Sequence, residues 1–391
     1  MPGDLAGRCA IVGTGQTPYT RGTDRSTLQL QLDAAERAIA DAGLTPADID
    51  AVMPNAMSER IAEDFIVELG LPDVAYTSTH HTGGASVLSA VQSACLAVAA
   101  GVSRHALVVA GRRGYSAQRV STSQARPERV TATVGEFEKP YGAIVAAQWF
   151  AQSAQRHMHL YGTTEEQLGH VAVGCRRHAN LNPRAYMHGR GMTLEDHRRS
   201  RMITTPFRLF DCSLETDGAA AVVITSVERA ADLPHRPVLV RGIAEGHGDP
   251  PTSITQKHDI TVLDGLRSAG RRAFRMAGLR PADIDCAQLY DAFTWFVIAS
   301  LEALGFCGPG EGGPFVEDGR IGPGGALPVN THGGLLSEAH VSGMNHLVEA
   351  VHQLRGTAEP QRLVPGCEHA LVSNEGDFFE GSVAILERGG R

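Results

Sequence analysis

The chain of 391 residues has no apolar run of the 18 or so residues that a membrane-spanning helix needs. Its first residues also lack a basic segment followed by an apolar stretch, which is the pattern of a secretory signal. These two absences favour a cytoplasmic protein with no membrane partner.

Lysine is scarce as well, because Lys139 and Lys257 are the only lysines among the 35 Lys and Arg residues. The net charge is −8 and the sequence pI is near 6.1. An acidic chain of this kind has no electrostatic basis for binding nucleic acid or an anionic lipid surface. Any phosphate groups of a ligand would depend on arginine, for example on the short run at residues 198–201.

The seven cysteines are scattered, odd in number and never form a CxxC pair. The 17 histidines show no ligand spacing with cysteine or aspartate either. A zinc site is therefore not expected, and reduced cytosolic thiols are the better interpretation.

What the chain does contain is an alternation of buried strands with amphipathic helices. Residues 9–12 and 106–110 are short apolar runs typical of strands, and residues 28–42 and 87–100 have helical patterns. With 42% hydrophobic residues, the chain can fill two sizeable cores. This pattern predicts an α/β protein with helices covering a mostly buried sheet.

An internal repeat supports a duplicated α/β unit. AGLTPADID occupies residues 42–50, and AGLRPADID occupies residues 277–285. A glycine pair follows downstream in both copies, at 83–84 and at 333–334, ahead of helical patterns at 85–100 and 340–354. Two matches in the same order favour duplication over a chance recurrence of one turn.

The stretch between the repeats differs in composition, being rich in Arg, His, Gln and Tyr. Helical patterns lie at residues 146–160 and 164–178. We expect residues 1–111 with 215–245 to form the first half, residues 112–214 a lid insertion, and residues 246–391 the second half.

Several strings along the chain now indicate a family. They are AIVGTGQTPY at 10–19, HLYGTTEEQLGHVAV at 159–173, LETDGAAAVVITS at 214–226, QLYDAFTWF at 288–296 and NTHGGLLSEAHVSG at 330–343. In these strings the chain resembles the thiolase superfamily, most closely the sterol-carrier-protein thiolases and their bacterial lipid-transfer-protein relatives. The resemblance implies a thiolase fold, in which two duplicated α/β halves form a five-layered αβαβα sandwich with a helical lid.

A thiolase needs a cysteine at a helix N-terminus, where free amides and the helix dipole favour a thiolate. By counting back from Gly101, which closes the predicted helix, that cysteine position falls on Gly84. Cys95 lies 11 residues further on, about 16 Å along a helix, so it is not expected to substitute. The amides of Gly84, Ala85 and Ser86 remain candidates for an oxyanion pocket.

The two other active-site loops are altered too. Sterol-carrier thiolases carry His-Asp-Cys-Phe in the second loop, where this chain has Tyr290, Asp291, Ala292 and Phe293. The third loop of the family normally has Gly-His-Pro, and here only His340 remains of it. We therefore expect Tyr290 and His340 to be the catalytic residues. The predicted oxyanion and substrate pocket comprises Gly84, Ala85, Ser86, Asp291, Asn330, His332 and Gly334.

A phenol and an imidazole facing an oxyanion pocket cannot carry out ping-pong acyl transfer, but they can move protons beside a thioester enolate. The resemblance to steroid side-chain aldolases without the thiolase cysteines implies retro-aldol cleavage of a β-hydroxyacyl-CoA, with coenzyme A as part of the substrate and no other cofactor. Histidine is the easier base near neutral pH, although tyrosine stays open as the base. A non-catalytic acyl-CoA-binding subunit and an unusual thiolase are the alternatives.

The resemblance also implies partners. Thiolase-fold proteins pair as two-fold dimers, so we expect a homodimer with residues 83–86 near the interface. The relatives without the cysteines imply a small companion with an OB fold and a zinc ribbon. Adjacent Phe378 and Phe379 in the C-terminal loop are either packed internally or covered by such a partner.

Overall fold

The computed structural model describes residues 5–55, 61–117, 134–250, 254–377 and 379–390. Nine of the strands in these ranges form one mixed sheet in the order β3-β2-β4-β7-β1-β8-β11-β10-β9. Its strands are β1 (Cys9–Gln16), β2 (Ala51–Pro54), β3 (Tyr76–Thr77), β4 (His105–Arg113), β7 (Asp217–Ser226), β8 (Val238–Gly246), β9 (Cys286–Gln288), β10 (His369–Glu375) and β11 (Gly381–Arg388).

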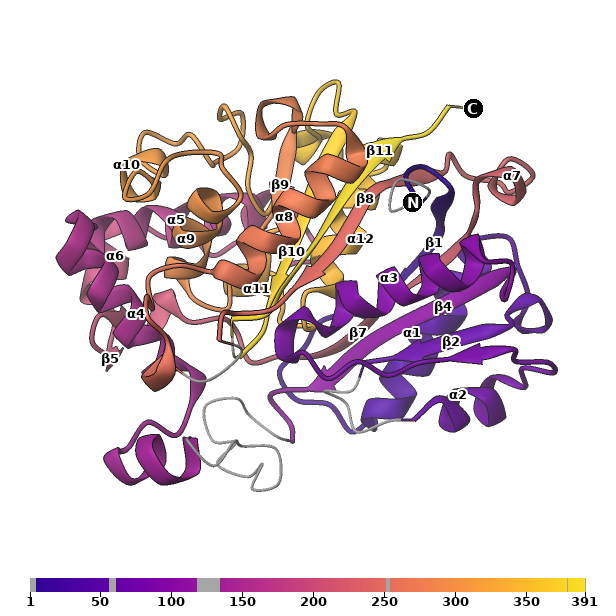
Figure 1. Cartoon of the computed structure of the whole chain (residues 1–391), viewed down its shortest axis with the longest axis horizontal. Helices are drawn as coiled ribbons and strands as arrows, with labels where there is room; N and C mark the ends of the chain where they lie inside the picture. The colour runs from indigo at the N-terminus through magenta and orange to yellow at the C-terminus, as the bar shows by residue number, and fades with distance from the viewer. Residues whose placement is uncertain (1–4, 56–60, 118–133, 251–253, 378, 391) are drawn as a thin grey trace.

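This sheet consists of two halves that are joined only at one corner. At this corner β1 of the first half pairs with β8, through Ala10 with Leu239 and Ile11 with Val238. Within the first half, by contrast, β4 pairs with β7 along its whole length. Beyond that corner the halves diverge, and α3 (Ser86–Ala99) and α12 (Met344–Arg355) lie between them in a shared apolar core. Figure 1 shows the first half in indigo to magenta beside the second in orange to yellow.

Helices also cover the two outer faces. Helices α1 (Thr27–Asp41) and α2 (Ala62–Leu69) pack on the first half, and α8 (Asp264–Ala277) and α9 (Thr294–Ala303) pack on the second. The order of layers is therefore αβαβα, which confirms the predicted thiolase fold.

The repeated sequence has the same structural role in both halves. Each copy ends a helix, forms a short 3-10 turn, at Pro46–Asp48 or Pro281–Asp283, and leads into a strand. Its last residue, Asp50 or Asp285, accepts hydrogen bonds from the amides that begin the neighbouring strand, including His105 N at 3.1 Å and His369 N at 2.8 Å. The backbone amides of both aspartates donate back to the carbonyls of the same two histidines.

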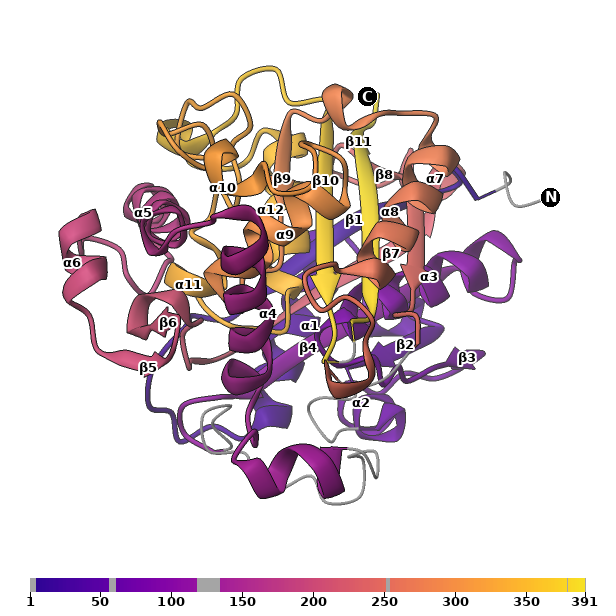
Figure 2. The same ribbon diagram turned by 60° about the vertical axis from the view of Figure 1, so that its left-hand side comes forward.

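The elements between β4 and β7 form a group of their own beside the second half. They include α4 (Ala146–Tyr161), α5 (Glu165–Leu181), α6 (Leu194–Arg199) and the hairpin of β5 (Met202–Thr204) and β6 (Phe207–Arg208). Helix α5 packs against α9 and α10 (Gly312–Phe315), as Figure 2 shows. We call residues 134–214 the lid.

Strand β8 pairs with strands of both halves. Its ladder with β11 runs from Val238 to Gly246, whereas its ladder with β1 has two residue pairs. The division expected at residue 245 therefore lies at the end of the strand that joins the halves, and it stays a prediction.

The helices expected at 28–42 and 87–100 are present as α1 and α3, each within one residue of its predicted ends. The strands expected at 9–12 and 106–110 are present as β1 and β4, which extend further, to Gln16 and Arg113. The expected helix at 340–354 begins later, at Met344, because Ser342 and Gly343 have φ of 53° and 81° and cannot continue a helix.

Among the described residues, no helix is both long and apolar enough to cross a membrane.

The paired roles of the two aspartates can be tested by stability. Asp50→Ala and Asp285→Ala should each lower the free energy of unfolding by about 1–3 kcal/mol, because each leaves strand-end amides without their acceptor. Denaturant unfolding measures this, with exposed Asp73→Ala as the control. Equal stability in all three variants would contradict the duplicated role.

Candidate active site

The predicted nucleophile position lies where a short turn, Gly83–Ala85, leads into α3. A Cβ added to Gly84 would lie 2.5 Å from Tyr290 Oη and 2.7 Å from Tyr290 Cζ. It would also collide with the carbonyl oxygen of Glu375. The phenol of Tyr290 therefore occupies the space that any side chain at position 84 would need.

The same turn uses most of its own amides. Ala85 N donates to Thr82 O at 3.0 Å, and the amide of Ser86 donates to the carbonyl of Gly83. Of the three amides predicted to bind an oxyanion, the amide of Gly84, in the turn before α3, is therefore the one that remains a candidate donor. Ser86 instead supports the turn, because its hydroxyl accepts a bond from Thr82 N at 3.0 Å.

The two predicted catalytic side chains meet beside this glycine. Tyr290 Oη lies 3.3 Å from His340 Nε2, and each residue is only 7% exposed. His340 Nδ1 lies 3.1 Å from Ser213 Oγ, and the His340 amide donates to Thr216 Oγ1 at 3.0 Å. With the proton on Nδ1 shared with Ser213, Nε2 is the acceptor for the tyrosine hydroxyl.

Burial sets the charge state of this pair. Desolvation holds the pKa of His340 well below its usual value, and the nearby cation of Arg112 lowers it further. Desolvation likewise raises the pKa of Tyr290 above its usual range, and Asp377 adds to the effect. At neutral pH, the site therefore contains a neutral imidazole that can accept a proton and a phenol that retains its own.

The loop that bears Tyr290 is anchored through the next residue, Asp291. Its fully buried carboxylate accepts bonds from Leu335 N at 2.7 Å and Leu336 N at 3.2 Å, at the start of α11 (Gly334–Ser337). His346 Nε2 lies 3.1 Å from Asp291 Oδ1 and 2.9 Å from Leu289 O. Both of these partners are acceptors, so Nε2 carries a proton and donates to the residues on either side of Tyr290.

Three other predicted pocket residues lie behind this loop. Asn330 donates to Leu289 O and accepts from Leu289 N, which fixes the strand end that leads to Tyr290. A Cβ at Gly334, where φ is 67°, would collide with the Asp291 carboxylate. Their contacts are thus structural supports, and direct contact with substrate stays a prediction for these residues.

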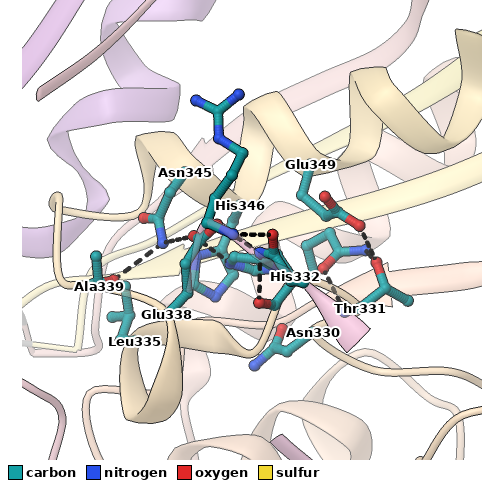
Figure 3. A network of polar contacts seen from close by, with 12 residues as sticks. Asn330, Thr331, His332, Leu335, Glu338, Ala339, Asn345, His346 and Glu349 are labelled. Carbon is teal, nitrogen blue, oxygen red and sulfur yellow. Dashed lines mark hydrogen bonds and ion pairs between the residues drawn. The ribbon is translucent and has the colours of Figure 1, made fainter. Parts of the chain in front are cut away.

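His332 is buried at 1% exposure in a polar network behind the His340 loop. Its ring packs edge to face on His346, with centroids 4.7 Å apart, and Nε2 lies 3.6 Å from Glu338 Oε2. Glu338 accepts amide protons from Asn345 at 2.9 Å and Asn182 at 3.0 Å (Figure 3). Burial raises the pKa of Glu338 to about 8, so this network carries little charge at neutral pH.

A hollow of about 260 Å³, including open solvent, lies between the lid and the C-terminal loop. It is lined by Val134, Glu138, Trp149, Phe150, Ile254, Asp377 and Phe379. Asp377 also adjoins the turn, since a Cβ at Gly83 would lie 3.0 Å from Asp377 N. The hollow therefore leads from the lid toward the glycine turn.

No thiol in this region has the character of a nucleophile. Cys175, whose Sγ lies 3.6 Å from Asp291 Oδ2, has its pKa raised by burial and by that carboxylate. Cys95 is buried in the central core, and burial raises the pKa of Cys212 to about 12.

In the described ranges, no group of three or more His, Cys, Asp or Glu side chains is arranged to hold a metal ion.

Several site residues were not predicted from sequence. Ser213 and Thr216 come from the segment before β7, and His346 comes from α12. Thr216 lies within the string at 214–226, but nothing in that string marks its role, and Ser213 and His346 lie outside the quoted strings. Each is brought to the site by the fold. Ser213 N donates to Ala292 O at 2.9 Å, which ties the histidine support directly to the tyrosine loop.

The fold and the site together define a thiolase-fold protein without the thiolase nucleophile, whose place is filled by a tyrosine hydroxyl. Comparison with known proteins agrees with this class. Residues 246–388 match the family model described as thiolase C-terminal domain-like.

Two curated relatives are similar over nearly the whole chain. The 17-hydroxy-3-oxo-4-pregnene-20-carboxyl-CoA lyase of Mycobacterium tuberculosis is 42% identical over 94% of this chain and 96% of its own length. The steroid side-chain-cleaving aldolase of Thermomonospora curvata is 40% identical over 91% of this chain and 93% of its own length.

A solved structure named Ltp2-ChsH2(DUF35) aldolase superposes with a TM-score of 0.93 at 37% identity, covering 99% of this chain and 100% of that one. The chain belongs to the thiolase superfamily, in the branch that contains these lyases and aldolases.

A side chain at position 84 and the phenol of Tyr290 would overlap. Changes at the two positions should therefore have non-additive effects on the free energy of unfolding. Gly84→Ala should lower the free energy of unfolding by about 1–3 kcal/mol, because the new Cβ overlaps the phenol. The same change made together with Tyr290→Ala should cost less, because the overlap with the phenol is removed while the collision with the Glu375 carbonyl oxygen remains. A double-mutant cycle from denaturant unfolding measures the coupling, and strictly additive changes would contradict the steric account.

Proposed function

We propose that this protein is a carbon–carbon lyase that cleaves a β-hydroxyacyl-CoA by a retro-aldol reaction. The products are a ketone and a shorter acyl-CoA, and the acyl part belongs to a steroid or bile-acid side chain. The observation that carries this proposal is the contact of Tyr290 with His340 in the space where a thiolase would hold its cysteine.

The reaction needs one proton removed and one returned. The base takes the proton of the β-hydroxyl group, the new carbonyl forms, and the bond between Cα and Cβ breaks. The electron pair of that bond passes into the thioester enolate. Protonation of the enolate carbon then yields the short acyl-CoA and restores the base, so no oxidant and no second substrate are consumed.

We assign the base to His340 and the proton-donating hydrogen bond to Tyr290. The neutral imidazole can accept at Nε2, which faces the phenol, while Ser213 holds the ring through Nδ1. Tyr290 keeps its proton near neutral pH, so it can donate to the substrate hydroxyl or relay that proton to Nε2. Tyr290 and His340 then act as one proton-transfer unit.

The negative oxygen of the enolate needs a hydrogen-bond donor other than Tyr290 and His340. The amide of Gly84 lies in the short turn just before the 14-residue helix α3, near the helix end where the dipole favours negative charge. Because Gly84 carries no side chain, a thioester oxygen can approach this amide closely.

The substrate class in this proposal rests on the relatives. One of the curated proteins described above is named as an aldolase that cleaves steroid side chains, and the other as a lyase of a pregnene-carboxyl-CoA. Coenzyme A would enter only as part of the substrate, with no separate cofactor. A cytoplasmic location is part of the same proposal.

The pair can be tested directly. Tyr290→Phe should remove most cleavage of a β-hydroxyacyl-CoA while acyl-CoA binding changes by only a few-fold, because one hydroxyl is lost. His340→Ala should lower kcat by about 10²–10⁴. Product formation and equilibrium binding are measured for each variant.

Near-wild-type rates in both variants would contradict the assigned roles. Binding without any turnover in the wild type would favour a non-catalytic acyl-CoA-binding subunit. An acyl adduct on a cysteine, detected by mass spectrometry, would instead favour a thiolase.

We further propose a homodimer and a small companion subunit with an OB fold and a zinc ribbon. The solved relative whose name joins Ltp2 with a DUF35 protein supports a companion. Strand β3 at the sheet edge has only Tyr76 and Thr77 in its ladder, so a second copy could pair there. On the lid, Phe137 and Tyr141 are 61% and 86% exposed, which suits a protein partner.

The structure bears on two expectations about these contacts. Phe379 is 2% exposed and lies 5.9 Å from Phe150 between ring centroids, so of the two alternatives it packs internally, while Phe378 lies outside the described residues. Arg198 and Arg199 both pair with Glu195 and remain exposed, so their contact with the phosphates of coenzyme A stays a prediction.

Co-expression with such a companion should yield a complex of two copies of this chain and the partner, with higher activity than the chain alone. Phe137→Ser with Tyr141→Ser should weaken that complex and leave the two-fold dimer intact, because only the lid is changed. Size-exclusion chromatography with light scattering measures both assemblies. A fully active chain that binds no companion would remove this part of the proposal.

A further inference from the structure

Glu375, at the end of β10, is a buried carboxyl that the proposed mechanism does not use. It is 2% exposed, and no ion pair reaches it from the described part of the chain. Its Oε1 accepts two hydroxyl donors, Ser300 Oγ at 3.0 Å and Ser373 Oγ at 3.1 Å. Its other oxygen, Oε2, has no hydrogen-bond partner among the residues described.

This carboxyl lies beside the tyrosine of the candidate site. Ser373, which donates to Glu375, also accepts from Tyr290 N at 3.4 Å. Ser300 lies one turn after Phe296 on α9, and the Phe296 ring packs edge to face against Tyr290 with centroids 6.3 Å apart. The main-chain oxygen of Glu375 borders the empty side-chain position of Gly84.

An ionised carboxylate is costly in this place. The titratable and charged groups near this corner are Tyr290, Asp291 and Asp377, with Arg112 near the tyrosine. Two of the first three are acidic, and Asp291 already engages His346. The two hydroxyl donors to Oε1 favour the ionised form, but burial without an ion pair in the described part of the chain, and an Oε2 with no partner there, outweigh them, so the carboxyl keeps its own proton.

We propose that Glu375 is a positioning residue that works in its neutral, protonated form and sets the alkaline limit of turnover. It holds the Tyr290 loop through Ser373 without placing a negative charge where the enolate forms. Loss of its proton would put a negative charge beside the Tyr290 loop, which Ser373 joins to this carboxyl, and that charge would oppose the negative enolate. This inference rests on the proposed lyase function.

Burial raises the pKa of Glu375 to about 8, with the Asp291 charge acting in the same direction. Below that pH the group is neutral, and above it the group becomes negative. Activity should therefore be full near pH 7 and decline as the pH rises through about 8. Tyr290 does not lose its proton in this window, because its own pKa is raised above the usual range.

The chain offers a matched control in Glu338. Its pKa is also raised to about 8 by burial, yet both of its oxygens are hydrogen-bonded, to Asn182 and Asn345. It lies behind the His340 loop, and its charge is not among the influences on Tyr290. Glu338→Gln removes a buried carboxyl with a similarly raised pKa at another place. It should therefore lose activity in alkaline solution to the same extent as the wild type.

The test compares kcat and KM from pH 6 to pH 10 for the wild type, Glu375→Gln, Glu375→Ala and Glu338→Gln. In the wild type, kcat should fall by roughly tenfold or more across the alkaline limb, with KM little changed. Glu375→Gln, which imitates the neutral acid, should remove the limb. Glu375→Ala should lower kcat at every pH, because Ser373 loses its acceptor, and Glu338→Gln should retain the limb.

Infrared difference spectra give a readout that does not depend on substrate. The carbonyl stretch of a protonated carboxyl should be present at pH 7, should titrate near pH 8, and should lose one component in Glu375→Gln and a different one in Glu338→Gln. Thermal unfolding checks that each variant is folded. If no β-hydroxyacyl-CoA is cleaved, the proposed function fails, whereas this spectrum still reports whether Glu375 is neutral.

Two activity results would overturn the inference, and so would one spectroscopic result. One is an unchanged alkaline limb in Glu375→Gln. The other is a folded Glu375→Gln that is inactive at every pH, since that would mean that the carboxyl itself gives or takes a proton. Absence of the Glu375 component from the infrared spectrum at pH 7 would overturn it independently of any activity.

Discussion

Position 84 and the phenol of Tyr290 cannot both occupy the same space, and the chemistry of the site depends on this exclusion. With glycine at 84, Tyr290 Oη reaches the start of α3 and lies 3.3 Å from His340 Nε2. With cysteine there, the phenol would have to move away from the helix. In the proposed mechanism, a proton carrier takes the place of the nucleophile, and proton transfer beside a thioester replaces acyl transfer.

Tyr290 and His340 keep these positions because hydrogen bonds hold the two loops that carry them. Asp291 joins the tyrosine loop to the start of α11, and His346 donates to the residues before and after Tyr290. Ser213 holds the imidazole and is itself bonded to the backbone of the tyrosine loop. These contacts are buried, so each is worth more than an exposed bond and leaves an unpaired group if it is broken.

Much of this arrangement could be predicted from sequence, because motif strings preserve both order and spacing. The αβαβα layers, the empty nucleophile position and the pair Tyr290 and His340 all follow from aligned strings and a repeated cassette. Contacts made by single residues from distant elements could not be predicted. His346 lies on a helix 55 residues beyond Asp291, and no local pattern marks it as the partner of that carboxylate. The neutrality of Glu375 depends on what surrounds it, which only the folded chain reveals.

The central claim is that this chain breaks a carbon–carbon bond without a thiol nucleophile. The most direct measurement is a mass-spectrometric product balance after incubation with a panel of steroid-type β-hydroxyacyl-CoA substrates in the absence of free coenzyme A. The account predicts equal amounts of ketone and short acyl-CoA from at least one substrate. Cleavage that requires added coenzyme A, or products that appear only from β-ketoacyl-CoA, would contradict it.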